Sequence, residues 1–326
     1  MMTRRDFFIA LPVSAAALAA QTPRPGSGQA PRLGSGQAPR LGSGQAGAAK
    51  RIGIVDDDLD NYHTRVYLEA IRGPLKDRGY VVAGATSLQH EKSRAWAAKN
   101  GLEYYDTAAA LDKVADVYAV IAPSTPGTHE ELCGLVLPFG KTTFVDKTFA
   151  PDVAAAGRIF KLADRHKVAL QTSSALRYTA VQKHVAAVGR DQVRHVVTWG
   201  PGRSYDEYAI HPVEAAVSCL GPEARALMRR GTDPESQLLV DFSDGRTAVV
   251  NVYNRRNTPY AASVTTAKET RYLEVDTKPL FVDAAAAMLD FFAAGRELVD
   301  RRETMAVMRI LEAARDPAAL ERFVKL

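Results

Sequence analysis

Short apolar runs alternate with amphipathic segments from residue 50 to about residue 172. The apolar runs lie at 51–55, 80–85, 117–122, 142–146 and 168–172. Runs without polar alternation are typical of parallel strands that are buried on both faces. The segment after Pro151-Asp152 has helical periodicity, because Val153, Ala156, Ile159, Phe160 and Ala163 fall on one face. This order predicts an α/β domain at 50–172, with a Rossmann-type doubly wound parallel sheet.

The pattern changes after residue 173. Strand-like runs follow one another at 193–199, 236–242, 246–253, 260–267 and 270–275. The stretch Ser243-Asp244-Gly245 predicts a hairpin turn between two of them. Helical segments are expected near 177–188, 207–220, 281–294 and 303–315. Consecutive strands with short turns predict a second domain at 173–326, an α+β unit with an open, mainly antiparallel sheet.

The first 49 residues have a different composition. Thr3-Arg4-Arg5-Asp6-Phe7-Phe8 precedes an apolar run that ends at Ala20, and Ala17-Leu18-Ala19 offers small residues for cleavage. This pattern predicts a twin-arginine-type signal at 1–20, export by the twin-arginine machinery and a periplasmic or otherwise exported location. Residues 21–49 repeat Gly-Ser-Gly-Gln-Ala-Pro-Arg-Leu with a period of eight, which predicts a flexible linker.

Charge and cysteine content narrow the function classes. The net charge is +5, but five arginines and one aspartate at 1–49 contribute +4 of it, so residues 50–326 carry about +1. A nearly neutral domain does not predict the positively charged surface that binds nucleic acid, and no nucleic-acid partner is expected. Cys133 and Cys219 lie in separate helical segments, which predicts two buried thiols rather than a disulfide.

Three motifs in order carry a resemblance to a known family. They are Ala122-Pro123-Ser124-Thr125-Pro126 with His129, then Val145-Asp146-Lys147-Thr148, then Glu207-Tyr208-Ala209-Ile210-His211-Pro212-Val213-Glu214. In this order and spacing the chain resembles the Gfo/Idh/MocA oxidoreductases, which include glucose–fructose oxidoreductase and inositol 2-dehydrogenase. The resemblance spans roughly residues 50–316. It implies a nucleotide-binding domain, a second domain whose sheet forms homo-oligomer contacts, and NAD(P)-dependent chemistry on a sugar or polyol.

The resemblance also implies catalytic roles for several residues. Lys147 matches the family's lysine, which lies between the substrate hydroxyl and the nicotinamide, and His211 matches its catalytic histidine. An imidazole with an ordinary pKa of about 6.5 suits proton transfer from an alcohol. Glu207 and Glu214 share a helical face with His211, so either carboxylate is expected to orient the ring. A loop lysine and a helix-capping histidine are the structural alternatives. The substrate contacts implied are Arg177, Tyr178 and Tyr208.

The loop after the first strand conflicts with cofactor binding. Aligned on the strand, the family's three glycines fall at Asp56, Asp58 and Asn61, and Asp57 and Asp60 add further charge. Two like charges at 4 Å repel by about 1 kcal/mol in water and about 4 kcal/mol at an effective dielectric of 20. A diphosphate in the usual pose is therefore expected to bind poorly. The alternatives are a helix cap facing water or an improvised cation site, although an EF-hand is excluded by the missing glycine and glutamate. No metal site is expected.

Other cofactor contacts are implied by the resemblance at Ser87, Ser124, Thr125, His129 and Lys147. Neutral residues follow the second strand at Thr86-Ser87-Leu88-Gln89, with Lys92 and Arg94 nearby, which favours NADP over NAD. The first interpretation is an exported NAD(P)-dependent oxidoreductase acting on a sugar or polyol CH–OH group. The alternative is a non-catalytic carbohydrate-binding relative that has lost nucleotide binding. A hydrolase or lyase that reuses the same cleft is the third.

Overall fold

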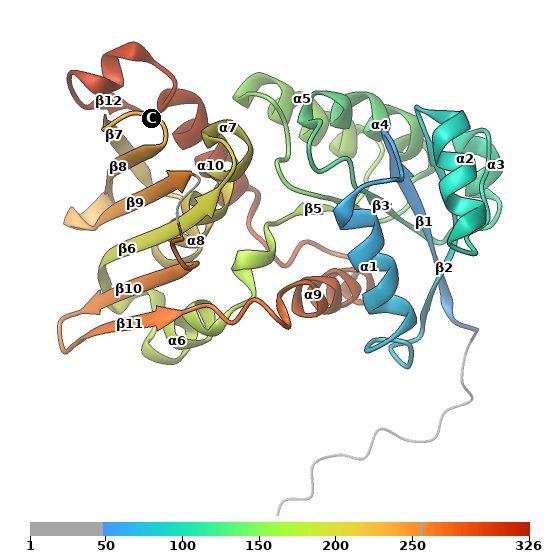
Figure 1. Ribbon diagram of the computed structural model, residues 1–326, viewed down its shortest axis with the longest axis horizontal. Coiled ribbons are helices and arrows are strands. Elements are labelled where there is room, and N and C mark those ends of the chain that lie inside the picture. The colour runs from blue at the N-terminus through green and yellow to red at the C-terminus, as the bar shows by residue number, and fades with distance from the viewer. Residues whose placement is uncertain (1–47, 255–256) are drawn as a thin grey trace, which may run out of the picture. The chain divides into compact units, whose positions relative to one another are not determined.

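The computed structural model describes residues 48–254 and 257–326 (Figure 1). The predicted signal segment and nearly all of the predicted linker lie outside the described residues. The described residues belong to one compact unit. Among the helices of the described residues, none has both the length and the apolar character needed to cross a membrane.

A parallel five-stranded sheet forms the first half of this unit, in the order β2-β1-β3-β4-β5. Its strands are β1 (Lys50–Asp56), β2 (Tyr80–Ser87), β3 (Val117–Val120), β4 (Thr143–Val145) and β5 (Leu170–Thr172). Every neighbouring pair is parallel, which confirms the predicted Rossmann-type sheet. The strand order reverses between β1 and β3, so the crevice used for ligands in such sheets lies at the carboxyl ends of these two strands.

Helices cover both faces of the parallel sheet (Figure 1). They are α1 (Tyr62–Arg72), α2 (His90–Lys99), α3 (Ala108–Asp112), α4 (His129–Val136) and α5 (Val153–Arg165), with the short helices η1 (Pro126–Thr128), η2 (Leu137–Phe139) and η3 (Ala175–Arg177). Helix α5 begins where the Asp152 side chain accepts a hydrogen bond from Ala155 N (2.7 Å), and its apolar face is buried as predicted.

A second sheet of seven strands has the order β11-β10-β6-β9-β8-β7-β12. Its strands are β6 (Val193–Gly202), β7 (Ala224–Arg230), β8 (Glu235–Phe242), β9 (Thr247–Asn254), β10 (Ala261–Thr266), β11 (Thr270–Glu274) and β12 (Val324–Lys325). Every neighbouring pair except β6–β9 is antiparallel, which confirms the mainly antiparallel sheet. Sequence reasoning missed β7, whose arginines hide its apolar alternation, and the two-residue edge strand β12.

The remaining helices pack on one face of the second sheet or cross to the first. They are α6 (Ala180–Val188), α7 (Tyr205–Tyr208), α8 (Ile210–Leu220), α9 (Leu280–Ala294) and α10 (Arg301–Ala313), with the short helices η4 (Arg190–Gln192), η5 (Ser243–Gly245) and η6 (Pro317–Leu320). Helix α8 is buried along almost its whole length against β6. Helix α9 packs into the core of the parallel sheet, beside α1 (Figure 1).

Two local predictions are also confirmed. Cys133 in α4 and Cys219 in α8 are both buried and unpaired. The turn between β8 and β9 places Asp244 at φ 62°, a left-handed conformation that aspartate tolerates better than most residues. The hairpin therefore forms at the predicted Ser243-Asp244-Gly245 turn.

Candidate active site

A cavity of about 620 Å³ lies where the two halves of the compact unit meet. Its walls come from the start of α1, the loops after β3 and β4, and the segment that contains α7 and the start of α8. Its lining residues are Asn61, Tyr62, His63, Tyr67, Pro123, Ser124, Asp146, Lys147, Ala175, Leu176, Arg203, Glu207, Tyr208, His211, Tyr260, Thr277, Leu280 and Phe281. Lys147, Glu207, His211 and Tyr208 are thus brought together.

Lys147 is the second residue after β4 and is 6% exposed. Among the described residues, the one hydrogen bond of its Nζ goes to Pro123 O, at 3.2 Å. Burial lowers the pKa of Lys147, and Asp146 and Glu207 only partly oppose this effect. The amine can therefore hydrogen-bond to a ligand oxygen or release a proton more readily than a surface lysine.

His211 lies in the first turn of α8, with Nδ1 2.8 Å from Ser174 Oγ. Burial lowers the pKa of His211 well below its ordinary value, and Lys147 and His63 lower it further. The ring is therefore neutral at pH 7. A neutral imidazole in a cavity can accept a proton.

The expected contact between His211 and a glutamate is not made. Glu207 Oε1 accepts from Ser124 Oγ (3.1 Å), and Glu214 accepts from Arg177 Nε (2.8 Å) and Ser174 N (2.8 Å). Glu214 does not line the cavity. The prediction was wrong on this point because helical spacing shows which side chains share a face and not which partner lies across from them.

A second imidazole in the cavity was missed as a site residue. His63, in the first turn of α1, hydrogen-bonds through Nδ1 to the carboxylate of Asp146, which is 1% exposed. The Phe281 ring packs edge-on against His63, with centroids 5.0 Å apart. A carboxylate that accepts from Nδ1 fixes the ring and leaves Nε2 available for a further partner. The available signal was that Asp146 directly follows a buried strand.

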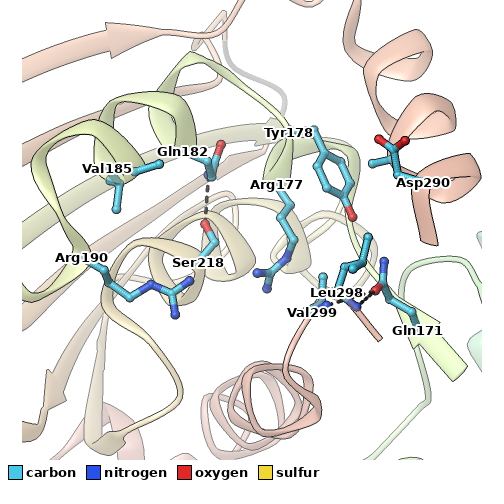
Figure 2. A pocket seen from close by; sticks show the side chains of 12 residues that line it. Gln171, Arg177, Tyr178, Gln182, Val185, Arg190, Ser218, Asp290, Leu298 and Val299 are labelled. Carbon is cyan, nitrogen blue, oxygen red and sulfur yellow. Dashed lines mark hydrogen bonds between the residues drawn. The ribbon is translucent and has the colours of Figure 1, made fainter. Parts of the chain in front are cut away.

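Two predicted substrate residues lie at a different cavity. Arg177 and Tyr178 line a cavity of about 390 Å³ beside α6 and α9, shown in Figure 2. Arg177 is buried and paired with Glu214 (2.8 Å) and Glu303 (2.5 Å). The structure therefore gives Arg177 a place in a buried ion-pair network and not in the larger cavity.

The cofactor residues predicted around the sheet edge are also dispersed. Ser124 lines the larger cavity, but Thr125 does not. Ser87 Oγ lies 3.1 Å from the Tyr104 hydroxyl oxygen. His129 is fully buried, with one ring nitrogen facing Ile121 O and the other Phe149 O (2.9 and 3.1 Å). It therefore holds two loops together and presents no free nitrogen to a ligand.

Asp56 occupies the crevice between β1 and β3. Its Oδ1 accepts from the backbone N–H groups of Asp57 (2.8 Å) and Ala122 (3.0 Å). Its Oδ2 accepts from Asn61 Nδ2 (2.8 Å) and Thr64 Oγ1 (2.5 Å). Asp56 is 1% exposed, and burial raises its pKa to about 7 in spite of these four donors. The Asp56 carboxylate therefore occupies the place between β1 and β3 where the strand order of the sheet reverses.

Asn61 caps the N-terminus of α1 with its side chain. Its Oδ1 accepts from Thr64 N (3.0 Å), and its Nδ2 also donates to Asp58 O (2.8 Å). Asp60 N donates to Asp58 Oδ1 (3.1 Å). Several amides that a diphosphate needs at a helix N-terminus are therefore already bonded to the protein's own oxygens.

The two loops that flank an adenosine ribose in a Rossmann fold are tied to each other. Leu88 N donates to Asp56 O (3.1 Å), and Gln89 N donates to Asp57 O (2.9 Å). With Asp56 and Asn61 in place, the residues present do not fit a dinucleotide held by its diphosphate at α1. The described residues also contain no group of three histidine, cysteine or acidic side chains placed to hold a metal ion.

Comparison with known protein families finds a match in the first half of the described chain. The model of an oxidoreductase family with an NAD-binding Rossmann fold, Gfo/Idh/MocA, matches residues 61–174. The predicted resemblance to this family is confirmed. A search of curated protein sequences finds no match.

Solved structures show the same two-domain fold at low sequence identity. A probable dehydrogenase from Thermotoga maritima has a TM-score of 0.72 and 15% identity, over 84% of this chain and 98% of that one. A myo-inositol 2-dehydrogenase from Lactobacillus plantarum has a TM-score of 0.72 and 12% identity, over 85% and 99%. GenD2 from gentamicin A biosynthesis, solved with NAD, has a TM-score of 0.71 and 17% identity, over 89% and 99%. At these identities the likeness establishes the fold.

Proposed function

We propose that this chain, whose residues 61–174 match the Gfo/Idh/MocA Rossmann domain, binds a sugar or polyol without a dinucleotide in the family's pose. The observation that carries the proposal is a difference between two groups of polar residues near the carboxyl edge of the parallel sheet. Lys147, His211 and Glu207 still face a cavity, whereas the Asp56 carboxylate and the Asn61 amide fill the position of the diphosphate.

The chemistry of the cavity supports a polyhydroxylated ligand. Lys147 and Arg203 supply donors, and the Glu207 carboxylate supplies acceptors. Aromatic rings also line the walls, among them Tyr208 and Tyr260, whose rings lie 5.8 and 5.9 Å from that of His211. Sugar rings have apolar C–H faces that pack on aromatic rings and hydroxyls that need hydrogen bonds, so they match this mixture.

A second candidate function is NAD(P)-dependent oxidation of a sugar or polyol CH–OH group. It is favoured by the presence of Lys147 and His211 in one cavity and by the family match. It requires the Asp56–Asn61 network to open or the dinucleotide to bind elsewhere, with NADP favoured by the neutral Ser87 and by Lys92 and Arg94.

Thermal unfolding separates the two candidates. A ligand present at 100 times its Kd stabilises the folded protein by about 2.7 kcal/mol, which gives a measurable rise in Tm. We expect such a rise with at least one member of a panel of monosaccharides and inositols, and none with 1 mM NAD or NADP. A rise with either dinucleotide and none with the panel would reverse the assignment.

A cavity variant shows where the ligand binds. Tyr260→Ala removes a ring from the wall of the cavity, whereas Phe323→Ala removes an exposed ring that lies just before β12 and outside the cavity. We expect the first substitution to abolish the sugar-induced rise in Tm and the second to preserve it. Equal effects of the two variants would place the ligand outside this cavity.

Two further proposals concern location and assembly. Arg4-Arg5 supports export, and Lys substitutions at both positions are expected to retain the chain in the cytoplasm of an export-competent host.

The uncovered face of the second sheet carries Trp199 and Tyr272, with ring centroids 5.9 Å apart, which supports a homo-oligomer through this face. Trp199→Glu is expected to lower the molar mass in light scattering.

A further inference from the structure

We infer that the cavity catalyses redox-neutral proton transfer at the carbon next to a carbonyl group, using the two imidazoles His63 and His211 with Lys147 at the carbonyl oxygen. This inference rests on the proposed function and narrows its ligand to an α-hydroxycarbonyl sugar. It requires no dinucleotide, which is consistent with the Asp56–Asn61 network.

The two imidazoles approach the cavity from opposite halves of the unit. His63 is presented by α1 of the parallel-sheet half, and His211 is presented by α8 of the other half. Each ring is fixed through Nδ1, by Asp146 in one case and Ser174 in the other. Among the described residues, Nε2 of neither ring makes a hydrogen bond, so both nitrogens are available to a substrate.

Lys147 completes the arrangement at the end of β4. Its chain neighbour Asp146 bonds to His63, and its Nζ bonds to the carbonyl of Pro123 and, within the described part of the chain, to no carboxylate. A cation without a close counterion can stabilise an oxygen that gains negative charge during a reaction. The three groups therefore supply a base, an acid and an electrophile around one cavity.

The proposed step balances in atoms and electrons. One imidazole Nε2 takes the proton from the carbon that bears the hydroxyl, and the C–H electron pair becomes the new C=C bond of an enediolate. The carbonyl π pair moves to its oxygen, where the Lys147 ammonium stabilises the charge. The imidazolium formed by this transfer, after exchanging its proton with water, returns a proton to carbon while the other, neutral imidazole hydrogen-bonds to the enediolate hydroxyl. The enediolate then collapses to the carbonyl, and no electrons leave the substrate.

Proton transfer of this kind is measured as exchange of the carbon-bound hydrogen in D₂O. The probes are 1,3-dihydroxyacetone, erythrulose and fructose, followed by proton NMR with no nucleotide added. His63→Asn and His211→Asn each keep a side-chain nitrogen near the Nδ1 position and remove Nε2. We expect exchange with at least one probe, reduced about 100-fold or more in both variants.

His195→Asn is the matched control. His195 lies on β6 outside the cavity, with its Nδ1 2.9 Å from Thr247 Oγ1, and its replacement is expected to leave exchange within twofold of wild type. Circular dichroism and Tm confirm that each variant is folded, and Lys147→Met is expected to slow exchange as the histidine variants do.

The outcomes separate this inference from the proposed function. A rise in Tm with one of the ketoses without exchange overturns the proton-transfer step and leaves the binding function standing. Exchange that appears only after NAD or NADP is added also overturns it. If none of the sugars and polyols binds, the proposed function fails and the inference fails with it.

Discussion

The turn between β1 and α1 and the cavity around Lys147 lie at the same edge of the parallel sheet, yet they use polar groups in opposite ways. In the turn, the buried Asp56 carboxylate accepts four hydrogen bonds and Asn61 caps the helix. In the cavity, Lys147 Nζ hydrogen-bonds to Pro123 O, and His211 is bonded at Nδ1. Polar groups that are satisfied within the chain stabilise its fold, and those left facing a cavity are available to a ligand.

The same criterion separates residues that look alike in the sequence. Arg177 and Lys147 are both buried cations that follow a strand of the parallel sheet. Arg177 is paired with Glu214 and Glu303, whereas Lys147 has no such pair among the described residues. The comparison therefore assigns Arg177 to stability and Lys147 to function, and the two assignments can be tested separately.

The largest expected effect is on the Arg177 network. Arg177→Leu leaves Glu214 without its cation and Glu303 with Arg190 alone, and both carboxylates are buried. Removing one partner of a buried ion pair typically costs about 3–5 kcal/mol. We expect a loss of this size in the free energy of unfolding, measured by urea denaturation.

The surface pair Arg78–Asp290 is the matched control for that measurement. Its side chains are 40% and 58% exposed, so Arg78→Leu is expected to cost at most about 1 kcal/mol. If Arg177→Leu costs no more than Arg78→Leu and removes the sugar-induced rise in Tm, Arg177 belongs with the ligand-binding residues after all.

Much of the fold could be predicted from the sequence, because β3, β4 and β5 are buried throughout and β1 and β2 are buried toward their carboxyl ends, so the strands lie in mainly apolar runs. Lys147 and His211 could be placed at the site because they lie just after a strand and at a helix start. The partners could not be predicted. His63 and Asp146 are 83 positions apart, and His211 and Ser174 are 37 apart, so only the tertiary packing brings them together. A run of aspartates also does not show that the side chain of Asp56 is the buried one.

The second prediction concerns pH and tests whether Asp56 is structural. Burial raises its pKa to about 7 in the folded protein, above its ordinary value of 3.8 in the unfolded chain. The folded state therefore holds a proton that the unfolded state loses, and stability falls as pH rises through this window. We expect wild type to lose up to about 1.4 kcal/mol per pH unit between pH 4 and pH 7 relative to Asp56→Asn.

The measurement is the difference in unfolding free energy between wild type and Asp56→Asn at a series of pH values. Using the difference cancels the groups common to both proteins, including His211, whose lowered pKa acts in the opposite direction. The difference should be flat below pH 4 and above about pH 7. A difference that does not change with pH would mean that the carboxylate is hydrated and free to leave the crevice, which would reopen the position for a diphosphate.

The smallest expected effect has the opposite sign. Lys147 is buried and hydrogen-bonds to the carbonyl of Pro123, and burial lowers its pKa, so its charge costs stability in the fold. Lys147→Met keeps the side-chain length and removes that cost, and we expect it to raise the free energy of unfolding by about 1 kcal/mol while it abolishes ligand-dependent chemistry.

Lys141 is the control, because its Nζ donates to Asp112 O (2.7 Å), to the Asp112 carboxylate and to Ala115 O (2.9 Å). Lys141→Met should therefore destabilise the protein. If both substitutions destabilise it equally, Lys147 is a structural residue, and the distinction between the closed turn and the open cavity no longer holds.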